Sequence, residues 1–321
     1  MRVLLWHVHG SWTTAFLQGP HDYLLPVTPG RDADGLGRAT TWCWPSSARE
    51  VPVAALAGTD FDVVVLQRPH ELDLVPRWTG RRPGRDLPAV YVEHNTPKGD
   101  VPWTRHPLAD RSDIPVVHVT HFNELFWDNG SAPTWVVEHG VVDPGYRYRG
   151  DLARAAVVVN EPVRRGRVTG TDLLPRLAGA APLDVFGLQV AGLPAATGLG
   201  PEQLAAYEGL PQQALHEALA RRRVYAHPVR WTSLGLSLLE AMFLGLPVAA
   251  LATTAAVEAV PPGAGVLATS VNTLVEAVRR YVEDPDAAEE LGRAGRAAVV
   301  DRYGVERFVK DWDRLLQEVT R

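Results

Sequence analysis

Cysteine and lysine are almost absent from this 321-residue sequence. The one cysteine, Cys43, has no partner for an internal disulfide and no second thiolate for a cysteine-ligated metal, which predicts a reducing environment. Lysine occurs only at Lys98 and Lys310, so arginine supplies nearly all of the positive charge. Any phosphate group must therefore be held by arginine, histidine or backbone N–H groups. The same bias indicates a GC-rich bacterial genome, and we expect an actinobacterial source.

Long apolar runs and a strong charge of either sign are also missing. No stretch approaches the roughly 20 apolar residues that span a bilayer. The apolar run at the start of the sequence is interrupted by histidine and glycine too early for the core of a signal peptide. A net charge of -5 and a pI near 6.1 argue against nucleic-acid binding. We expect a cytoplasmic protein with at most peripheral membrane contact, and the sequence leaves its oligomeric state open.

Two motifs of cofactor and metal chemistry are missing as well. The turn after the first predicted strand, HGSW at residues 9–12, carries one glycine and is not a G-x-G-x-x-G, which disfavours a Rossmann oxidoreductase. No D-x-D pair stands on a loop where a metal–diphosphate clamp needs it, and the histidines lack a metal-ligand spacing. We therefore expect neither a metal ion nor a bound cofactor.

Short apolar segments that end in polar or glycine-containing turns recur along the chain. This pattern is typical of parallel α/β sheets, whose ligand-binding loops follow the carboxyl ends of the strands. In the first half it predicts strands at 2–8, 23–27, 61–67, 89–93, 115–120 and 134–137, and a short helix at 122–127. The next segment, 142–151, contains proline and glycine without periodicity and is the predicted linker.

The second half alternates strands with helices. The predicted strands are 155–160, 183–188, 223–227, 247–251 and 265–268; the predicted helices are 171–179, 201–207, 211–221, 235–244, 271–283, 286–300 and 305–319. The fold class is α/β, with two Rossmann-like domains that face each other across a cleft. We place the first domain at 1–145 and the second at 152–303, with a C-terminal helix at 304–321 that packs back on the first domain.

One stretch, 224–251, concentrates the features of a binding site. It reads as a strand, a glycine turn, a helix and a second strand, which together form a βαβ unit. The turn ends at Gly235 and places backbone N–H groups beyond the strand end, where such folds bind ligands. Glu240 lies among apolar helix neighbours, so we interpret it as a site carboxylate rather than as an exposed acid. These features favour a nucleotide-sugar pocket.

Three arginines occur within four residues, at Arg164, Arg165 and Arg167. Thr169, Gly170 and the start of a predicted helix follow them directly. Clustered guanidinium groups beside a helix start predict an anion site. The alternative is a solvated loop, and the sequence leaves open which arginine contacts an anion.

The stretch with Glu240 resembles the retaining GT-B glycosyltransferases of the family-four type (glycosyl transferases group 1). Their motif P-S-R-x-E-G-F-G, a helix with a second glutamate and then G-x-P-V corresponds to Pro228–Gly235, Glu240 and GLPV at 245–248. Thr232 stands where the family has its first glutamate, which contacts the donor sugar. A second family pattern places its arginine on Arg164, and Thr169 stands where the family has a lysine.

The resemblance implies metal-independent transfer of a sugar, with retention of configuration, from a nucleotide-diphosphate sugar to an acceptor. The second domain would bind the donor, and the first would hold a small-molecule, lipid or glycan acceptor. Negative charge grows on the leaving diphosphate, and fixed cationic groups stabilise it. The implied catalytic residues are Arg164 and His94, the latter in the strand-end segment YVEHNTP. The implied donor set is Gly10, Arg164, Arg165, Arg167, Thr169, Gly170, Arg230, Thr232, Ser233, Leu234, Gly235, Leu236 and Glu240.

The acceptor side carries less information. Ser11, Trp12, Arg68 and His70 stand at predicted strand ends of the first domain and are the candidate acceptor contacts. Two other functions stay open. The chain could be a non-catalytic nucleotide-sugar or glycan-binding protein that lost turnover with the Thr232 and Thr169 changes, or a sugar-nucleotide epimerase of the same fold.

Overall fold

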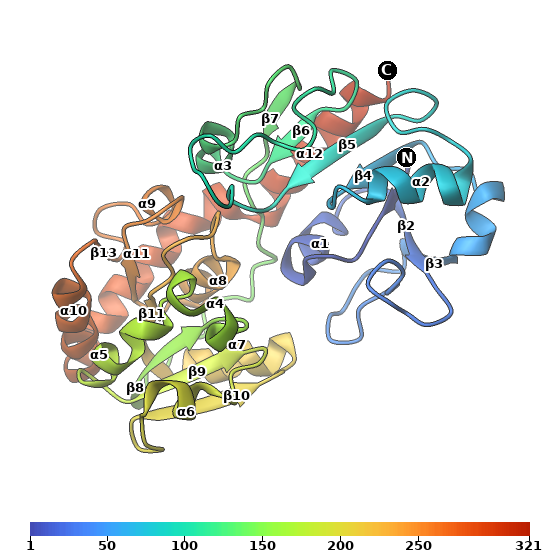
Figure 1. Cartoon of the computed structure of the whole chain (residues 1–321). Coiled ribbons are helices and arrows are strands. Elements are labelled where there is room, and N and C mark those ends of the chain that lie inside the picture. Colours follow the sequence, from blue (N-terminus) through green and yellow to red (C-terminus); the bar gives the residue numbers. More distant parts are fainter. The chain divides into compact units, whose positions relative to one another are not determined.

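The computed structural model describes residues 1–321, which form two compact units (Figure 1). Unit 1 comprises Met1–Val142 and Val305–Arg321, and unit 2 comprises Asp143–Gly304. Each unit contains one parallel sheet with helices connecting its strands. None of the helices combines the length and apolarity that crossing a membrane requires.

The sheet of unit 1 has seven strands in the order β3-β2-β1-β4-β5-β6-β7, and all of its pairings are parallel. Its central strands consist almost entirely of buried apolar residues, as expected for strands covered on both faces. The strands are β1 (Arg2–Leu5), β2 (Asp22–Val27), β3 (Ala48–Pro52), β4 (Val63–Leu66), β5 (Ala89–Glu93), β6 (Val116–His118) and β7 (Thr134–Val136).

The helices of unit 1 are α1 (Gly10–Phe16), the 3-10 helix η1 (Val53–Gly58), α2 (Glu71–Thr79), α3 (His121–Phe126) and α12 (Val305–Val319). Helix α12, at the red end of the chain in Figure 1, is part of unit 1 although it comes last in the sequence. Its apolar face packs against α1, where Trp312 contacts Trp12 and Phe16 edge to face at ring-centroid distances of 5.6 and 5.1 Å.

The sheet of unit 2 has six strands in the order β10-β9-β8-β11-β12-β13, and its pairings are also parallel. The strands are β8 (Leu152–Val158), β9 (Leu183–Gly187), β10 (Leu204–Glu208), β11 (Arg222–His227), β12 (Val248–Leu251) and β13 (Val266–Ala268). The helices are α4 (Pro162–Arg165), η2 (Gly166–Val168), η3 (Thr171–Leu173), α5 (Leu174–Ala178), α6 (Leu193–Thr197), α7 (Gln212–Ala220), α8 (Leu236–Leu244), α9 (Ala256–Ala259), α10 (Val271–Glu283) and α11 (Pro285–Tyr303).

These assignments confirm the α/β class and most of the predicted elements of the second half. The helix predicted at 201–207 is wrong, because Leu204–Glu208 forms strand β10 and pairs with β9 at the sheet edge. The first strand, predicted to run to residue 8, ends at Leu5. Helices α1, α2, α4, α6 and α9, the 3-10 helices η1 and η2 and strand β3 were not predicted.

Candidate functional site

Helix α8 in unit 2 begins directly after Gly235 and is buried over most of its length, from Leu238 to Leu244. Gly235 has an ordinary φ of -69°, so its role is spatial rather than conformational. A Cβ at this position would lie 2.6 Å from Cε1 of His227, which no larger residue could tolerate without moving the ring. The glycine therefore brings the start of α8 close to the carboxyl end of β11.

Glu240 lies on this helix and is only 6% exposed. Its Oε2 is 3.7 Å from Nε2 of His216 on the neighbouring helix α7. The same nitrogen of His216 lies 2.8 Å from Nε2 of Gln212, one helical turn earlier. A buried carboxylate held beside an imidazole is well placed to accept hydrogen bonds from ligand hydroxyl groups. The sequence had not singled out His216, although its i, i+4 pairing with Gln212 was visible.

His227 is a supporting residue beneath this turn. Burial lowers its pKa to about 4, so the ring is neutral near pH 7. Its Nδ1 lies 3.3 Å from the hydroxyl of Tyr225, which donates to Oγ of Ser237 at 2.9 Å. This buried network joins β11 to the first turn of α8.

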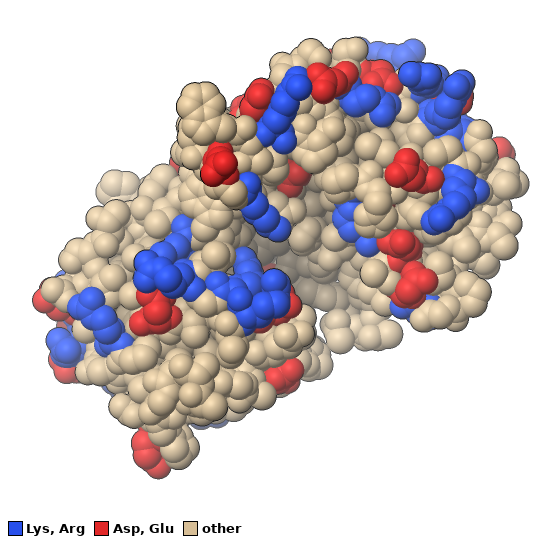
Figure 2. Space-filling view, viewed as in Figure 1, with Lys and Arg blue, Asp and Glu red and all other residues tan.

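The three clustered arginines follow β8, the strand beside β11, and they have different surroundings. Figure 2 shows Lys and Arg side chains gathered over the region where Figure 1 places α4. Arg164, 67% exposed, is paired with Glu161, and its Nε donates to that carboxylate at 2.9 Å. Arg165 is half-buried and forms no side-chain hydrogen bond or ion pair, and burial lowers its pKa. Arg165, rather than Arg164, is therefore the cluster's available cationic donor.

Arg167 and Arg230 share one carboxylate. Asp172 accepts from NH1 of Arg167 at 3.0 Å and from both terminal nitrogens of Arg230 at 2.6 and 2.9 Å. Arg230 also donates to the carbonyl of Arg167 at 2.8 Å. These bonds tie the loop after β8 to the loop after β11. Arg230 therefore acts as a clamp between the two loops, and its donor contact stays a prediction.

Thr169 and Gly170 shape the same loop. The hydroxyl of Thr169 is buried and donates to the carbonyl of Gly166 at 3.1 Å. Thr169 therefore supports the loop, and its donor contact stays a prediction. Gly170 adopts φ +77°, and a Cβ there would overlap the carbonyl oxygen of Pro228. Glycine is required by both the backbone conformation and the close approach of the second loop.

The turn from 232 to 236 presents one polar side chain that the protein leaves available. Thr232 is partly exposed, and its hydroxyl has no hydrogen-bond partner. Ser233 and Leu234 are buried, and the carbonyl of Ser233 accepts from the N–H of Ala255 at 3.2 Å. Leu236 is partly exposed at the start of α8. Of this predicted set, Thr232 is the side chain best placed to contact a ligand.

In unit 1, polar groups meet at the carboxyl ends of the adjacent strands β1, β4 and β5. The ring of His94, after β5, lies 4.1 Å from the ring of His9, measured between centroids. Its Nε2 is 3.0 Å from Oε1 of Gln67, which follows β4. Burial lowers the pKa of His9 to about 4 and holds that of His94 well below its ordinary value. Both rings are therefore neutral near pH 7. The sequence had not singled out Gln67.

The predicted acceptor contacts Arg68 and His70 are engaged within unit 1. Nε of Arg68 donates to Glu71 at 2.7 Å, and Glu71 is fully buried with a pKa raised by burial. Both Arg68 and His70 contact Oδ1 of Asp34, at 3.2 and 2.8 Å. This network anchors the loop after β4.

Trp12, a predicted acceptor contact, is part of the core of unit 1. Its side chain is 0% exposed and lies between Phe16, with which it stacks at 4.8 Å, and α12. Ser11, beside it, is partly exposed. Gly10 allows the indole of Trp42 to approach, because a Cβ at Gly10 would lie 2.9 Å from the indole nitrogen. Gly10 therefore accommodates a side chain of its own unit.

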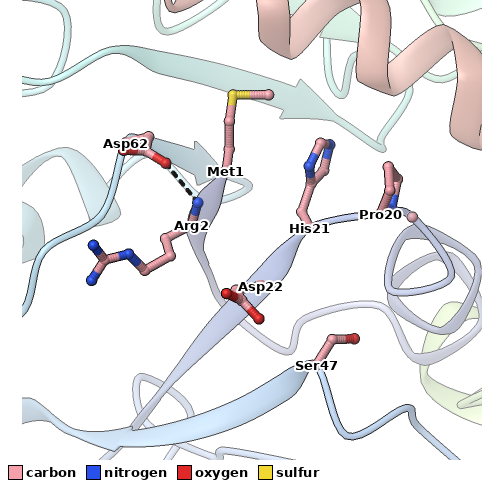
Figure 3. A pocket seen from close by; sticks show the side chains of 8 residues that line it. Met1, Arg2, Pro20, His21, Asp22, Ser47 and Asp62 are labelled. Carbon is pink, nitrogen blue, oxygen red and sulfur yellow. Dashed lines mark hydrogen bonds between the residues drawn. The ribbon is translucent and has the colours of Figure 1, made fainter.

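An open hollow of about 520 Å³ lies at the amino ends of the strands in unit 1, opposite the carboxyl ends that carry His94 and Gln67. Figure 3 shows its lining side chains, with the N–H of Arg2 donating to Asp62 at 2.7 Å. The lining residues are Met1, Arg2, Gly19, Pro20, His21, Asp22, Ser47 and Asp62, which precede or begin the strands β1 to β4. Ligands of parallel α/β sheets bind at the carboxyl edge, so this hollow is not the candidate site.

Comparison with known families finds one match. Residues 195–298, about a third of the chain, match the model of the family Glycosyl transferases group 1. The matched range includes β11, α8 and Glu240. No curated protein matches the chain.

Solved structures match nearly the whole chain at low identity. A sucrose-phosphate synthase from Thermosynechococcus elongatus is 16% identical with a TM-score of 0.75, over 99% of this chain and 98% of that one. HepE from Anabaena, in complex with UDP and glucose, is 14% identical with a TM-score of 0.71, over 99% and 100%. AviGT4, a glycosyltransferase involved in avilamycin A biosynthesis, is 14% identical with a TM-score of 0.61, over 99% and 98%. The chain therefore has the two-sheet α/β fold of the GT-B glycosyltransferases.

Proposed function

We propose that this protein is a glycosyltransferase that binds a nucleotide-diphosphate sugar at the carboxyl edge of the sheet in unit 2. The family match over residues 195–298 supports the proposal. The GT-B fold supports it as well, and the similar protein HepE has been solved in complex with UDP and with UDP-glucose.

One observation carries the proposal. The loops after the adjacent strands β8 and β11 present an unpartnered arginine, Arg165, and an unpartnered hydroxyl, Thr232, while α8 carries the buried carboxylate of Glu240. A diphosphate requires a cation, and the hydroxyl groups of a sugar and of a ribose form hydrogen bonds with a hydroxyl and a carboxylate. The other arginines of these loops, Arg164, Arg167 and Arg230, are already paired with Glu161 or Asp172.

In this proposal each group has a chemical role. Arg165 neutralises the charge that grows on the leaving diphosphate, with backbone N–H groups near Gly235 helping to hold it. Glu240 accepts hydrogen bonds from the ribose, and Thr232 contacts the donor sugar. Transfer retains the anomeric configuration through an oxocarbenium-like transition state, and the leaving phosphate takes the acceptor proton. No metal ion is needed, and unit 1 holds the acceptor near His94.

The test begins with donor binding. UDP, GDP, ADP and dTDP and their glucose or mannose conjugates are screened by thermal shift, because a ligand that binds the folded state raises its melting temperature. The best donor is then incubated with sugar, lipid and aromatic acceptors in the presence and absence of EDTA. We expect transfer in both conditions and a product whose anomeric coupling constant, measured by NMR, matches that of the donor. An inverted product would overturn retention.

A second candidate is a non-catalytic nucleotide-sugar-binding protein. Two positions favour it: Thr232 brings no charge to the donor sugar, and the hydroxyl of Thr169 is bonded within its own loop. This candidate predicts a nucleotide-sugar melting shift with neither transfer nor donor hydrolysis for any acceptor. Thr232→Glu, which restores the carboxylate of the resembled family, separates the two. It should alter donor preference in an enzyme and produce no turnover in a binding protein.

A further inference from the structure

Gln67 makes hydrogen bonds to two different parts of unit 1. Its Nε2 donates to the carbonyl of Trp6 at 2.7 Å, which fixes the orientation of the side-chain amide. Its Oε1 then faces His94, whose Nε2 lies 3.0 Å away. The side chain is buried, with 4% exposed.

The backbone beneath this amide is fixed as well. The N–H of Gln67 donates to Oε2 of Glu71 at 2.6 Å, and Nε of Arg68 donates to the other oxygen of the same carboxylate at 2.7 Å. The end of β4 is therefore held in place from the first turn of α2. Gln67 has little freedom to rotate its amide or to move away from His94.

This geometry determines which nitrogen of His94 carries the proton. An amide oxygen only accepts hydrogen bonds, so Nε2 of His94 must be the donor. In a neutral imidazole the second nitrogen, Nδ1, then carries the lone pair. Nδ1 of His94 can therefore accept a hydrogen bond but cannot donate one.

We propose that Gln67 is a positioning residue that holds His94 in the Nε2–H tautomer and fixes the plane of its ring. Its effect on catalysis rests on the proposed function, in which unit 1 holds the acceptor near His94. Its effect on the tautomer does not, because the Trp6–Gln67–His94 chain lies entirely in unit 1. Gln67 itself need not touch a substrate.

The tautomer is tested directly by NMR on the full-length protein labelled with 15N-histidine. Long-range proton–nitrogen spectra distinguish the protonated ring nitrogen from the unprotonated one, and a His94→Ala spectrum identifies the resonances of His94. We expect the Nε2–H form in the native protein and a mixture with the Nδ1–H form in Gln67→Leu. Gln67→Glu should place a carboxylate beside the ring and shift the titration of His94 to higher pH. Should Gln67→Leu fail to fold, Gln67→Glu carries the test alone.

The chain offers a matched control. His118 forms the same kind of bond, with its Nε2 3.0 Å from Oδ1 of Asn129. Asn129→Leu should change the His118 resonances and leave those of His94 in place. An unchanged His94 spectrum in both Gln67 variants would overturn the proposal.

Kinetics then separate this proposal from the proposed function. If transfer is found, Gln67→Leu should lower kcat about tenfold, with little change in the KM for donor. A tenfold loss corresponds to about 1.4 kcal/mol, which is the size of one neutral hydrogen bond. The pH–rate profile of Gln67→Glu should shift with the His94 titration. Equal losses of kcat in Gln67→Leu and Asn129→Leu would show a merely structural effect. A tautomer change in a protein without transferase activity would leave the positioning role standing and refute the function.

Discussion

Replacement of Arg165 by alanine should weaken binding of a nucleoside diphosphate much more than replacement of its neighbour Arg164. Arg165 is half-buried without a partner, so its donors are available to a phosphate at no cost to an existing pair. Hydrogen bonds to charged groups contribute about 1.5–3 kcal/mol, which corresponds to about 10–150-fold in affinity. Partial exposure places Arg165 toward the lower end, so we expect the Kd to rise about tenfold.

The comparison with Arg164 makes this prediction selective. Arg164 is largely exposed and already paired with Glu161, so Arg164→Ala should change the Kd by less than about threefold. Arg165→Ala removes no side-chain hydrogen bond or ion pair, so its free energy of unfolding should stay within about 0.5 kcal/mol of the native value. Isothermal titration with UDP, or with the diphosphate that gives the largest melting shift, measures both Kd values. A larger loss of affinity in Arg164→Ala than in Arg165→Ala would refute the assignment.

Three further outcomes are expected. Glu240→Ala should weaken binding of a nucleoside diphosphate at least tenfold by calorimetry, with a smaller loss for inorganic pyrophosphate, which lacks the ribose; equal losses for both would contradict a ribose contact. The pKa of His227 is about 4 in the folded protein and near 6.5 in the unfolded chain, so the unfolded chain binds more protons between these values. The free energy of unfolding should therefore fall by up to about 3 kcal/mol as the pH drops from 6.5 to 4. Urea unfolding of His227→Gln should show a shallower pH dependence, and an identical one would exclude His227 as the cause. Trp12→Ala should lower the free energy of unfolding by about 3–5 kcal/mol because it empties the α1–α12 core; native stability combined with weaker acceptor binding would restore Trp12 to the site.

The sequence predicted those helices and strands whose apolar residues follow a clear local spacing. Helices α10 and α12 match the predicted 271–283 and 305–319, because their apolar residues recur strictly at helical spacing. Helix α1 was missed because GSWTTAF contains glycine and two threonines, which are weak helix formers. Its formation depends on tertiary contacts, the packing of Trp12 and Phe16 on α12. Helix α2 was missed because Pro76 lies inside it.

The wrong helix at 201–207 has a similar cause. Gly200-Pro201-Glu202 resembles a helix start, with proline and an acid in the first turn. The segment instead extends along β9, with register Leu204 to Leu183 through Glu208 to Gly187. Backbone pairing at an open sheet edge outweighed a local preference of a few tenths of a kcal/mol per residue.

The sequence also predicted part of the candidate site, namely where its residues lie, but not which residues are paired with one another. Residue type and spacing located the loop with Arg164 and Arg165, the turn at Gly235 and the carboxylate of Glu240. They could not assign a partner to each charge. Only the three-dimensional structure shows that Arg164 forms an ion pair with Glu161 and that Arg230 forms one with Asp172. Gln67 stayed unnoticed because a glutamine at a strand end carries no motif, and its bond to His94 joins residues far apart in the sequence.

Calorimetric titration of the native protein and of Glu240→Ala with a panel of nucleoside diphosphates tests the central claim most directly. We predict that at least one diphosphate binds the native protein with one site per chain, and that Glu240→Ala lowers its affinity at least tenfold while the variant still unfolds in one cooperative thermal transition without ligand. If no nucleoside diphosphate or nucleotide sugar binds the folded native protein, or if Glu240→Ala binds it with unchanged affinity, the carboxyl edge of unit 2 is not a nucleotide-sugar site.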